Sequence, residues 1–255
     1  TGKIEMYGQT YHCWKKKGHG VVDLRNAMKQ SCDTYFYEIA RKLGVDRLKE
    51  TSIKFGLGEK VLQEKFDIEK KGLIPDTVWK KDKLGKGWVI GETLITGIGQ
   101  GYTQTTPLQL CQMTAQLANG GFKIYPKIIL EENEKTLEQI KSKMRENENR
   151  LDGELKETNE FLEFYNKKEH EALFKNPKNI KLVLEAMFAS TNEPRGTSYR
   201  SRIEDPKYQF AGKTGTSQVK RITEKDRELD LSTSEIPYNE RDHALYIAFG
   251  PYKNP

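Results

Sequence analysis

The sequence has no long apolar run and little cysteine. No stretch of about 18 apolar residues occurs, so no segment reads as a membrane-spanning helix, and no signal peptide is recognisable. The three cysteines are an odd number, which leaves at least one unpaired and does not define a redox compartment. Lys and Arg exceed Asp and Glu by 43 − 37 = 6 without a dense basic block, which argues against nucleic-acid binding.

Apolar residues make up 35% and charged residues 31% of the 255 residues, which predicts one large domain with a solvated segment. Residues 131–171 are that segment, because they are dense in Glu, Lys and Asn and sparse in apolar residues. We predict that 131–171 is a charged insertion, helical or disordered, with a partner-binding arm as the alternative. The ends of the sequence suggest a part excised from a longer protein, so 1–255 is expected to be a partial domain.

Apolar periodicity and turn residues predict helices first and strands last. Two short helices are expected over residues 21–44, with Asp33 at a capping position, while 57–91 reads as a long surface loop. The remaining expected elements are a helix over 46–55, a helix from Pro107 capped by Thr106, a strand over 122–130, a helix over 179–189, and strands over 208–218 and 243–249, the last buried on both faces. Without βαβ alternation, this order predicts an α+β fold in which helices cover a largely antiparallel sheet.

The run Lys213-Thr214-Gly215-Thr216-Ser217 lies on a predicted strand. A Lys-Thr-Gly triplet alone is weak, and a turn beside a lysine explains it as well. A strand edge that offers a cation, hydroxyls and a glycine also suits the binding of an extended peptide and its terminal carboxylate.

Ser31-Cys32-Asp33 forms a second motif, at the junction of two predicted helices. Simple helix capping explains Ser and Asp here, but a helix junction also lets side chains point into a cleft. Ser-x-Asp followed much later by Lys-Thr-Gly is two-thirds of the motif set of serine penicillin-binding proteins and β-lactamases, whose first part is Ser-x-x-Lys.

Several longer stretches carry the same resemblance. They are Gly18 to Leu24 leading into Ser31 to Tyr37, Gly97 to Tyr102 with Thr105 to Leu110, Ala211 to Gln218, and His243 to Asn254. In these stretches, and over nearly the whole chain outside 131–171, the sequence resembles class B penicillin-binding proteins, specifically the elongation-specific penicillin-binding protein 2 family. The resemblance implies a penicillin-binding transpeptidase fold, incomplete at both ends, and the C-terminal part of a peptidoglycan D,D-transpeptidase.

The resemblance also implies roles for individual residues in an acyl-enzyme route. Ser31 would relay a proton, Asp33 would hold the hydrogen-bond network, and Lys213 would polarise the relay. Substrate binding falls to Thr214, Gly215, Thr216 and Ser217, with the two threonine hydroxyls on the substrate carboxylate and the Thr216 N–H in the oxyanion hole.

The sequence departs from the family pattern because no Ser-x-x-Lys precedes Ser31. Only Ser217-Gln218-Val219-Lys220 fits that spelling, and a strand would point Ser217 and Lys220 to opposite faces. We therefore expect the nucleophile upstream of Thr1, and we expect this chain alone not to be acylated.

Cys13, His19 and Cys32 form a C-x5-H-x12-C set whose thiolate and imidazole groups suit Zn²⁺. Ordinary buried cysteines and a surface histidine explain this spacing equally well. Some relatives carry zinc beside the cleft, so the resemblance implies a structural zinc with a fourth ligand upstream of Thr1. The chemistry itself requires no cofactor, and Cys111 is expected in the core of its helix.

The leading functional prediction is a cell-wall transpeptidase that acts on stem peptides and is a β-lactam target. A serine β-lactamase, a β-lactam sensor and a non-catalytic envelope scaffold are the alternatives. By resemblance, the partners are a SEDS-family glycan polymerase and the rod-shape complex, with no nucleic acid. The implied location is the periplasmic face of the bacterial inner membrane, through an N-terminal anchor outside this chain.

Overall fold

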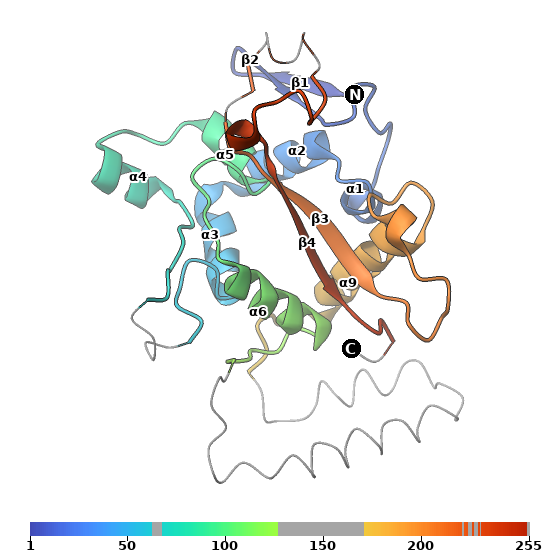
Figure 1. Ribbon diagram of the computed structural model, residues 1–255. Helices are drawn as coiled ribbons and strands as arrows, with labels where there is room; N and C mark the ends of the chain where they lie inside the picture. Colours follow the sequence, from blue (N-terminus) through green and yellow to red (C-terminus); the bar gives the residue numbers. More distant parts are fainter. Residues whose placement is uncertain are drawn as a thin grey trace.

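The computed structural model of the chain describes residues 1–62, 68–126, 171–220, 222–223, 226, 229 and 231–253 (Figure 1). In these residues, helices flank the strand pair β3 (Ala211–Ser217) and β4 (His243–Phe249), while the first antiparallel pair of the chain lies at one edge of the molecule, and this mixture confirms the α+β class. The first pair, β1 (Lys3–Met6) and β2 (Gln9–His12), is a hairpin that the sequence analysis did not predict. None of the helices in this part of the chain is both long and apolar enough to cross a membrane.

The helices predicted after this hairpin are present. They are α1 (Leu24–Lys29), α2 (Asp33–Leu43) and α3 (Val45–Lys54). The predicted capping role of Asp33 is wrong, because Cys32 is the capping residue of α2 and Asp33 is its first helical residue. The Asp33 carboxylate instead accepts a hydrogen bond from the backbone N–H of Trp14, at 2.8 Å.

The prediction of a surface loop over 57–91 is wrong in part. Helix α4 (Thr77–Leu84) lies within it, and α5 (Ile90–Thr96) begins before its end. Asp76 caps α4 by accepting a hydrogen bond from the Trp79 backbone at 2.6 Å. Lys80 is only 5% exposed and pairs with Glu92 of α5 at 2.6 Å, so a lysine that reads as solvated is buried by a tertiary ion pair.

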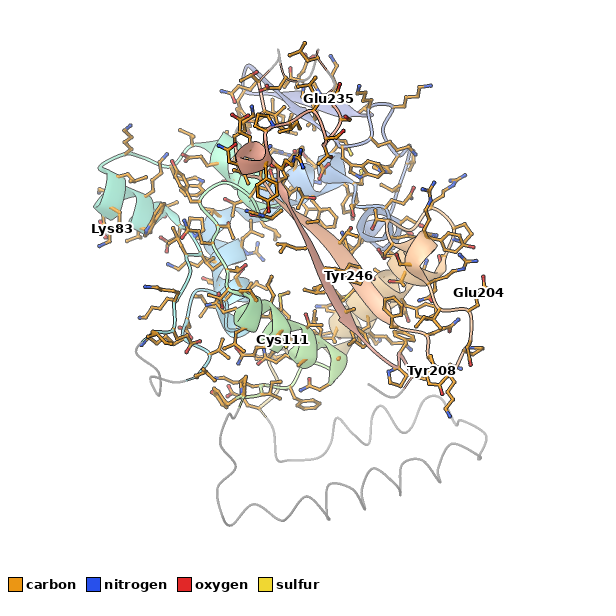
Figure 2. The ribbon with its side chains drawn as sticks, viewed as in Figure 1. Lys83, Cys111, Glu204, Tyr208, Glu235 and Tyr246 are labelled. Carbon is orange, nitrogen blue, oxygen red and sulfur yellow. The ribbon has the colours of Figure 1, made fainter. Side chains whose placement is uncertain are left out.

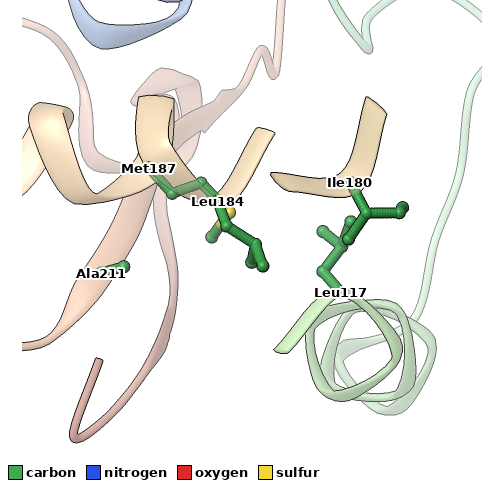
Figure 3. Packing of buried hydrophobic residues seen from close by; sticks show 5 residues of the cluster. All are labelled: Leu117, Ile180, Leu184, Met187 and Ala211. Carbon is green, nitrogen blue, oxygen red and sulfur yellow. The ribbon is translucent and has the colours of Figure 1, made fainter. Parts of the chain in front are cut away.

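The main core lies between two later helices and a strand. Helix α6 (Pro107–Ala118) begins with the predicted Thr106 cap, and α9 (Pro177–Asn192) is the other helix. Figure 3 shows how they pack: the buried members of the core are Leu117, Ile180, Leu184, Met187 and Ala211. Cys111 was predicted in the core, but it is exposed on α6 (Figure 2), and the buried residues of this helix are instead Gln109, Gln112, Thr114, Gln116 and Leu117.

The second strand pair consists of β3 (Ala211–Ser217) and β4 (His243–Phe249), in register from Ala211 opposite Phe249 to Ser217 opposite His243. Helix α9 packs against β3, and α6 packs against β4. The prediction that β4 is buried on both faces is wrong, since Leu245 and Tyr246 are 42% and 44% exposed. Within the described residues, β4 pairs with β3 alone and is therefore not enclosed.

The strand predicted over 122–130 is not formed in its described part. Residue Phe122 makes one isolated antiparallel bridge, with Ala172, and 127–130 lie outside the described residues. The predicted charged insertion, 131–171, lies outside the described residues except for Glu171. Its character stays a prediction.

Candidate active site

Ser31 lies in the turn between α1 and α2 and has a left-handed backbone, with φ of 52°. Such a conformation costs a non-glycine residue roughly 1 kcal/mol and persists where the surroundings fix it. Two backbone hydrogen bonds close this turn, from Ser31 N to Met28 O at 3.3 Å and from Cys32 N to Ala27 O at 2.8 Å. The Trp14 indole N–H donates to the carbonyls of Gln30 and Ser31, at 3.2 and 2.8 Å. The serine is therefore held in a braced turn.

The two sequence motifs meet in space. Lys213 on β3 donates from Nζ to Ser31 Oγ at 2.6 Å, although the residues are 182 positions apart in sequence. The same ammonium donates to the Thr214 carbonyl at 2.8 Å. This arrangement joins a hydroxyl that can pass a proton to a cation that can stabilise its alkoxide character.

The electrostatics of Lys213 are those of a buried amine. Burial lowers the pKa of Lys213 from 10.5 to about 8, and the charge of Asp33 opposes that shift. Burial also raises the pKa of Asp33, against the hydrogen bond from the Trp14 backbone. Strongly perturbed groups that converge on one place are typical of functional sites.

The rest of the Lys-Thr-Gly motif runs along β3. Thr214 is half-buried, whereas Gly215, Thr216 and Ser217 are exposed. In the described residues β3 pairs only with β4, so its other edge offers free N–H and C=O groups to an extended peptide.

The Ser217 to Lys220 pair is not a second site. Strand β3 ends at Ser217, and Lys220 pairs with Glu240 at 2.6 Å, away from the serine. Because Lys220 lies beyond the end of β3, the opposite-face argument does not apply, and it is the pairing with Glu240 that argues against a catalytic role for this lysine.

Cys13, His19 and Cys32 also come together. One ligand atom from each lies within 4.8 Å of the others, and Cys13 Sγ is 3.5 Å from His19 Nδ1. The usual tetrahedral Zn–S and Zn–N bonds separate the two ligand atoms by about 3.6 Å, so this pair fits zinc. His19 Nε2 is buried without a hydrogen-bond partner. Hydrogen bonding between the thiols lowers the pKa of Cys32 and raises that of Cys13, which prepares one thiolate.

Two residues that shape the site were not predicted from the sequence. Trp14 braces the Ser31 turn, and Thr197 accepts a hydrogen bond from the Thr214 hydroxyl at 3.0 Å. A tryptophan in a loop carries no motif. Thr197 follows the turn over 193–196 after the end of α9, and nothing in the sequence placed this turn beside β3.

The α+β fold and the Ser31–Lys213 pair are the features expected of the domain shared by penicillin-binding proteins and serine β-lactamases. The chain belongs to the family described as the penicillin-binding protein transpeptidase domain, whose model matches residues 1–255. This result confirms the resemblance seen in the motifs.

Among curated relatives, the peptidoglycan D,D-transpeptidase MrdA of Salmonella typhimurium is 34% identical over 250 residues, covering 96% of this chain and 35% of the relative. The chain thus spans about a third of that relative's length. The solved structures that are similar over 100% of the chain include two structures of PBP2. Pseudomonas aeruginosa PBP2 in complex with WCK 5153 has a TM-score of 0.73 and 32% identity over 47% of its length. Helicobacter pylori PBP2, in its complex with MreC, has a TM-score of 0.74 and 27% identity over 38% of its length.

Proposed function

We propose that this chain contributes the Ser-x-Asp and Lys-Thr-Gly parts of the active site of a peptidoglycan D,D-transpeptidase that works in cell elongation. The observation that carries the proposal is the 2.6 Å contact between Lys213 Nζ and Ser31 Oγ. The sequence relationship to MrdA supports the choice of a transpeptidase that acts on D-Ala-D-Ala stem peptides.

In the proposed reaction, a serine attacks the penultimate D-Ala carbonyl, D-Ala leaves, and the amine of a second stem peptide takes the acyl group. Ser31 passes the proton between the base and the leaving amine, and Lys213 stabilises the charge that develops during this transfer. Thr214 and Thr216 bind the terminal carboxylate, and the Thr216 N–H donates to the oxyanion. Gly215 lets the substrate backbone approach the free edge of β3.

The nucleophile in this proposal lies outside the 255 residues. The spelling Ser-x-x-Lys occurs only at Ser217 to Lys220, where the lysine is paired with Glu240. The 35% coverage of the Salmonella relative leaves ample chain for a serine and its lysine.

We also propose that Cys13, His19 and Cys32 hold a structural zinc beside Ser31. Their fit rests on the 3.5 Å separation between Cys13 Sγ and His19 Nδ1, and on one ligand atom from each of the three residues lying within 4.8 Å of the others. The metal would tie the segment after β2 to the start of α2, and no step of the acyl transfer passes through it.

The proposed setting is the periplasmic face of the inner membrane, with an N-terminal anchor outside this chain. We propose a SEDS-family glycan polymerase and the rod-shape complex as partners. The solved complex of Helicobacter pylori PBP2 with MreC supports a partner of this kind.

The test is intact-protein mass after incubation with penicillin, on this chain and on a version extended upstream through a Ser-x-x-Lys. We expect one stable adduct on the extended protein alone. In the extended protein, Lys213→Ala should slow acylation by about a hundredfold or more, as expected for loss of a cation that stabilises charge developing in the transition state. Lys220→Ala is the matched control, because Lys220 lies beyond the same strand and pairs with Glu240, so its loss should leave acylation unchanged.

Absence of any adduct on the extended protein would favour the non-catalytic scaffold and overturn the proposal. Rapid consumption of the drug without a lasting adduct would identify a β-lactamase instead.

A further inference from the structure

The turn between α9 and the short helix η2 (Tyr199–Ser201) is packed closely onto the end of α9. A Cβ atom on Gly196 would lie 2.2 Å from the Ser190 carbonyl oxygen, so only glycine lets the chain fold back here. Arg195 beside it has a left-handed backbone, with φ of 71°. A turn with so little freedom gives the next residue, Thr197, a fixed position.

The same turn is anchored to the helix that leads to Ser31. The Thr197 backbone N–H donates to the Lys29 carbonyl at 3.2 Å, and Lys29 is the last residue of α1. Glu193 at the end of α9 pairs with Lys29 Nζ at 2.8 Å and with Arg25. These contacts therefore hold the main chain of Thr197 at a fixed distance from the turn that contains Ser31.

The side chain of Thr197 faces the other motif. Thr214 Oγ1 donates to Thr197 Oγ1 at 3.0 Å, and Ser190 Oγ lies 3.0 Å from the same Thr197 oxygen. Ser190 is fully buried at 0% exposure, so its hydroxyl has no access to water. We call these three side chains, Ser190, Thr197 and Thr214, the hydroxyl chain.

We propose that Thr197 is a positioning residue that sets the orientation of the Thr214 hydroxyl for binding the substrate carboxylate. This inference rests on the proposed function and deepens it. Thr197 does not touch the substrate, and its effect passes through Thr214.

The physical basis is that each hydroxyl has one proton to donate and lone pairs to accept. With the site empty, Thr214 donates to Thr197. When a carboxylate binds, Thr214 turns its proton to the anion and accepts the Thr197 proton, while Ser190 donates to Thr197. A hydroxyl that accepts a hydrogen bond is a better donor, so the buried part of the hydroxyl chain strengthens the bond to the carboxylate. Only the directions of the hydrogen bonds reverse, and no proton is transferred from one oxygen to another.

A neighbouring hydroxyl cluster offers a matched control. Thr191 follows Ser190 in α9, is also fully buried, and bonds Ser198 at 3.2 Å and the Tyr246 hydroxyl at 3.1 Å. Thr191→Val removes a buried hydroxyl of the same kind from the adjacent position, outside the hydroxyl chain.

The experiment compares Thr197→Val, Thr197→Ser and Thr191→Val in the intact protein extended upstream, with benzylpenicillin, which carries a free carboxylate. Stopped-flow acylation separates the dissociation constant of the initial complex from the limiting acylation rate. For Thr197→Val we expect the dissociation constant to rise by about 3- to 10-fold, the effect of one neutral hydrogen bond, with the limiting rate unchanged. Thr197→Ser should restore wild-type binding, and Thr191→Val should keep it.

Three outcomes would overturn the inference. One is an unchanged dissociation constant in Thr197→Val. Another is a fall in the limiting acylation rate of Thr197→Val by the same factor as the rise in its dissociation constant. That result would mean that β3 has shifted and that the role of Thr197 is only structural. The third is an equal effect in Thr191→Val. Failure of the wild-type protein to be acylated would instead refute the proposed function, so the two failures are distinguishable.

Discussion

Lys213 is a partly buried cation, and replacing it with methionine tests how strongly its burial opposes folding. Methionine has a similar length, packs in apolar surroundings and carries no charge. The wild-type lysine makes two hydrogen bonds in this place, to Ser31 Oγ at 2.6 Å and to the Thr214 carbonyl at 2.8 Å. Lys213→Met therefore removes an unfavourable charge and two favourable contacts together.

The magnitude follows from the pKa of Lys213, which burial lowers from 10.5 to about 8. At about 1.4 kcal/mol for each pKa unit, the protonated form is disfavoured in the folded state by at most about 3.5 kcal/mol. The two lost hydrogen bonds are worth about 1 kcal/mol each. At pH 7 we therefore expect Lys213→Met to be more stable than wild type by about 1 kcal/mol, while acylation is lost.

The sign of the stability difference between Lys213→Met and wild type reverses as the pH rises. Between pH 8 and 10.5 the unfolded wild type holds a proton on Lys213 that the folded protein has released, so wild-type stability rises across this window. The variant lacks this contribution. Above pH 10.5 the neutral lysine keeps its hydrogen bonds without a buried charge, and wild type should be more stable by about 2 kcal/mol.

Urea unfolding of both proteins at pH 7, 9 and 10.5 gives the difference in unfolding free energy at each pH. Groups common to both proteins cancel in this difference, so the crossing belongs to Lys213. A difference that is independent of pH, or a variant that is less stable already at pH 7, would refute the argument that burial of the ammonium dominates.

Three further predictions concern the surroundings of the site. Zinc analysis should find about one ion for each wild-type protein and much less in Cys32→Ser, because one thiolate ligand is lost; a zinc-free wild type purified without chelator would contradict the metal proposal. Hydrogen bonding to Arg25 and ion pairing with Lys29 lower the pKa of Glu193 to about 2. The contribution of the Glu193 carboxylate to folding stability should therefore be full above about pH 4.5 and disappear as the pH falls to 2. Since a third of the Glu193 side chain is exposed, we expect Glu193→Gln to cost about 1 kcal/mol at pH 6 and nothing at pH 2, and an equal loss at both pH values in urea unfolding would count against it. Glu92→Gln should destabilise the protein by about 3–5 kcal/mol, because Lys80 keeps a buried charge without its carboxylate. The double change Lys80→Met with Glu92→Leu should cost much less in the same assay, and equal losses would argue against an ion-pair origin.

Much of the helical part was readable from the sequence because its signals are local. Thr106 before Pro107, and glycine after the end of α2, mark helix ends whatever lies around them. The two site motifs were readable for another reason, since Ser31-Cys32-Asp33 and Lys213-Thr214-Gly215 have a fixed order in a known family.

The wrong predictions concern which side chains are buried and what they contact, because burial depends on residues that are distant in the sequence. The segment around Lys80 was predicted to be a surface loop, although Lys80 is buried and pairs with Glu92 between two helices. The apolar strand β4 was interpreted as buried, although in the described residues only β3 pairs with it. Asp33 was interpreted as a cap, but its carboxylate binds Trp14 in a separate segment.

By itself, the sequence determined the α+β class, the helix ends and the residue types of the site, because these depend on short-range propensities and on motif order. Only the tertiary structure decided that Lys213 reaches Ser31, that Cys13, His19 and Cys32 come together, and that the Thr214 hydroxyl bonds Thr197. Each of these contacts joins segments that the sequence leaves independent. A hydrogen bond of about 3 Å between such segments exists only after helices and strands have packed, and this packing also changes the pKa of Lys213.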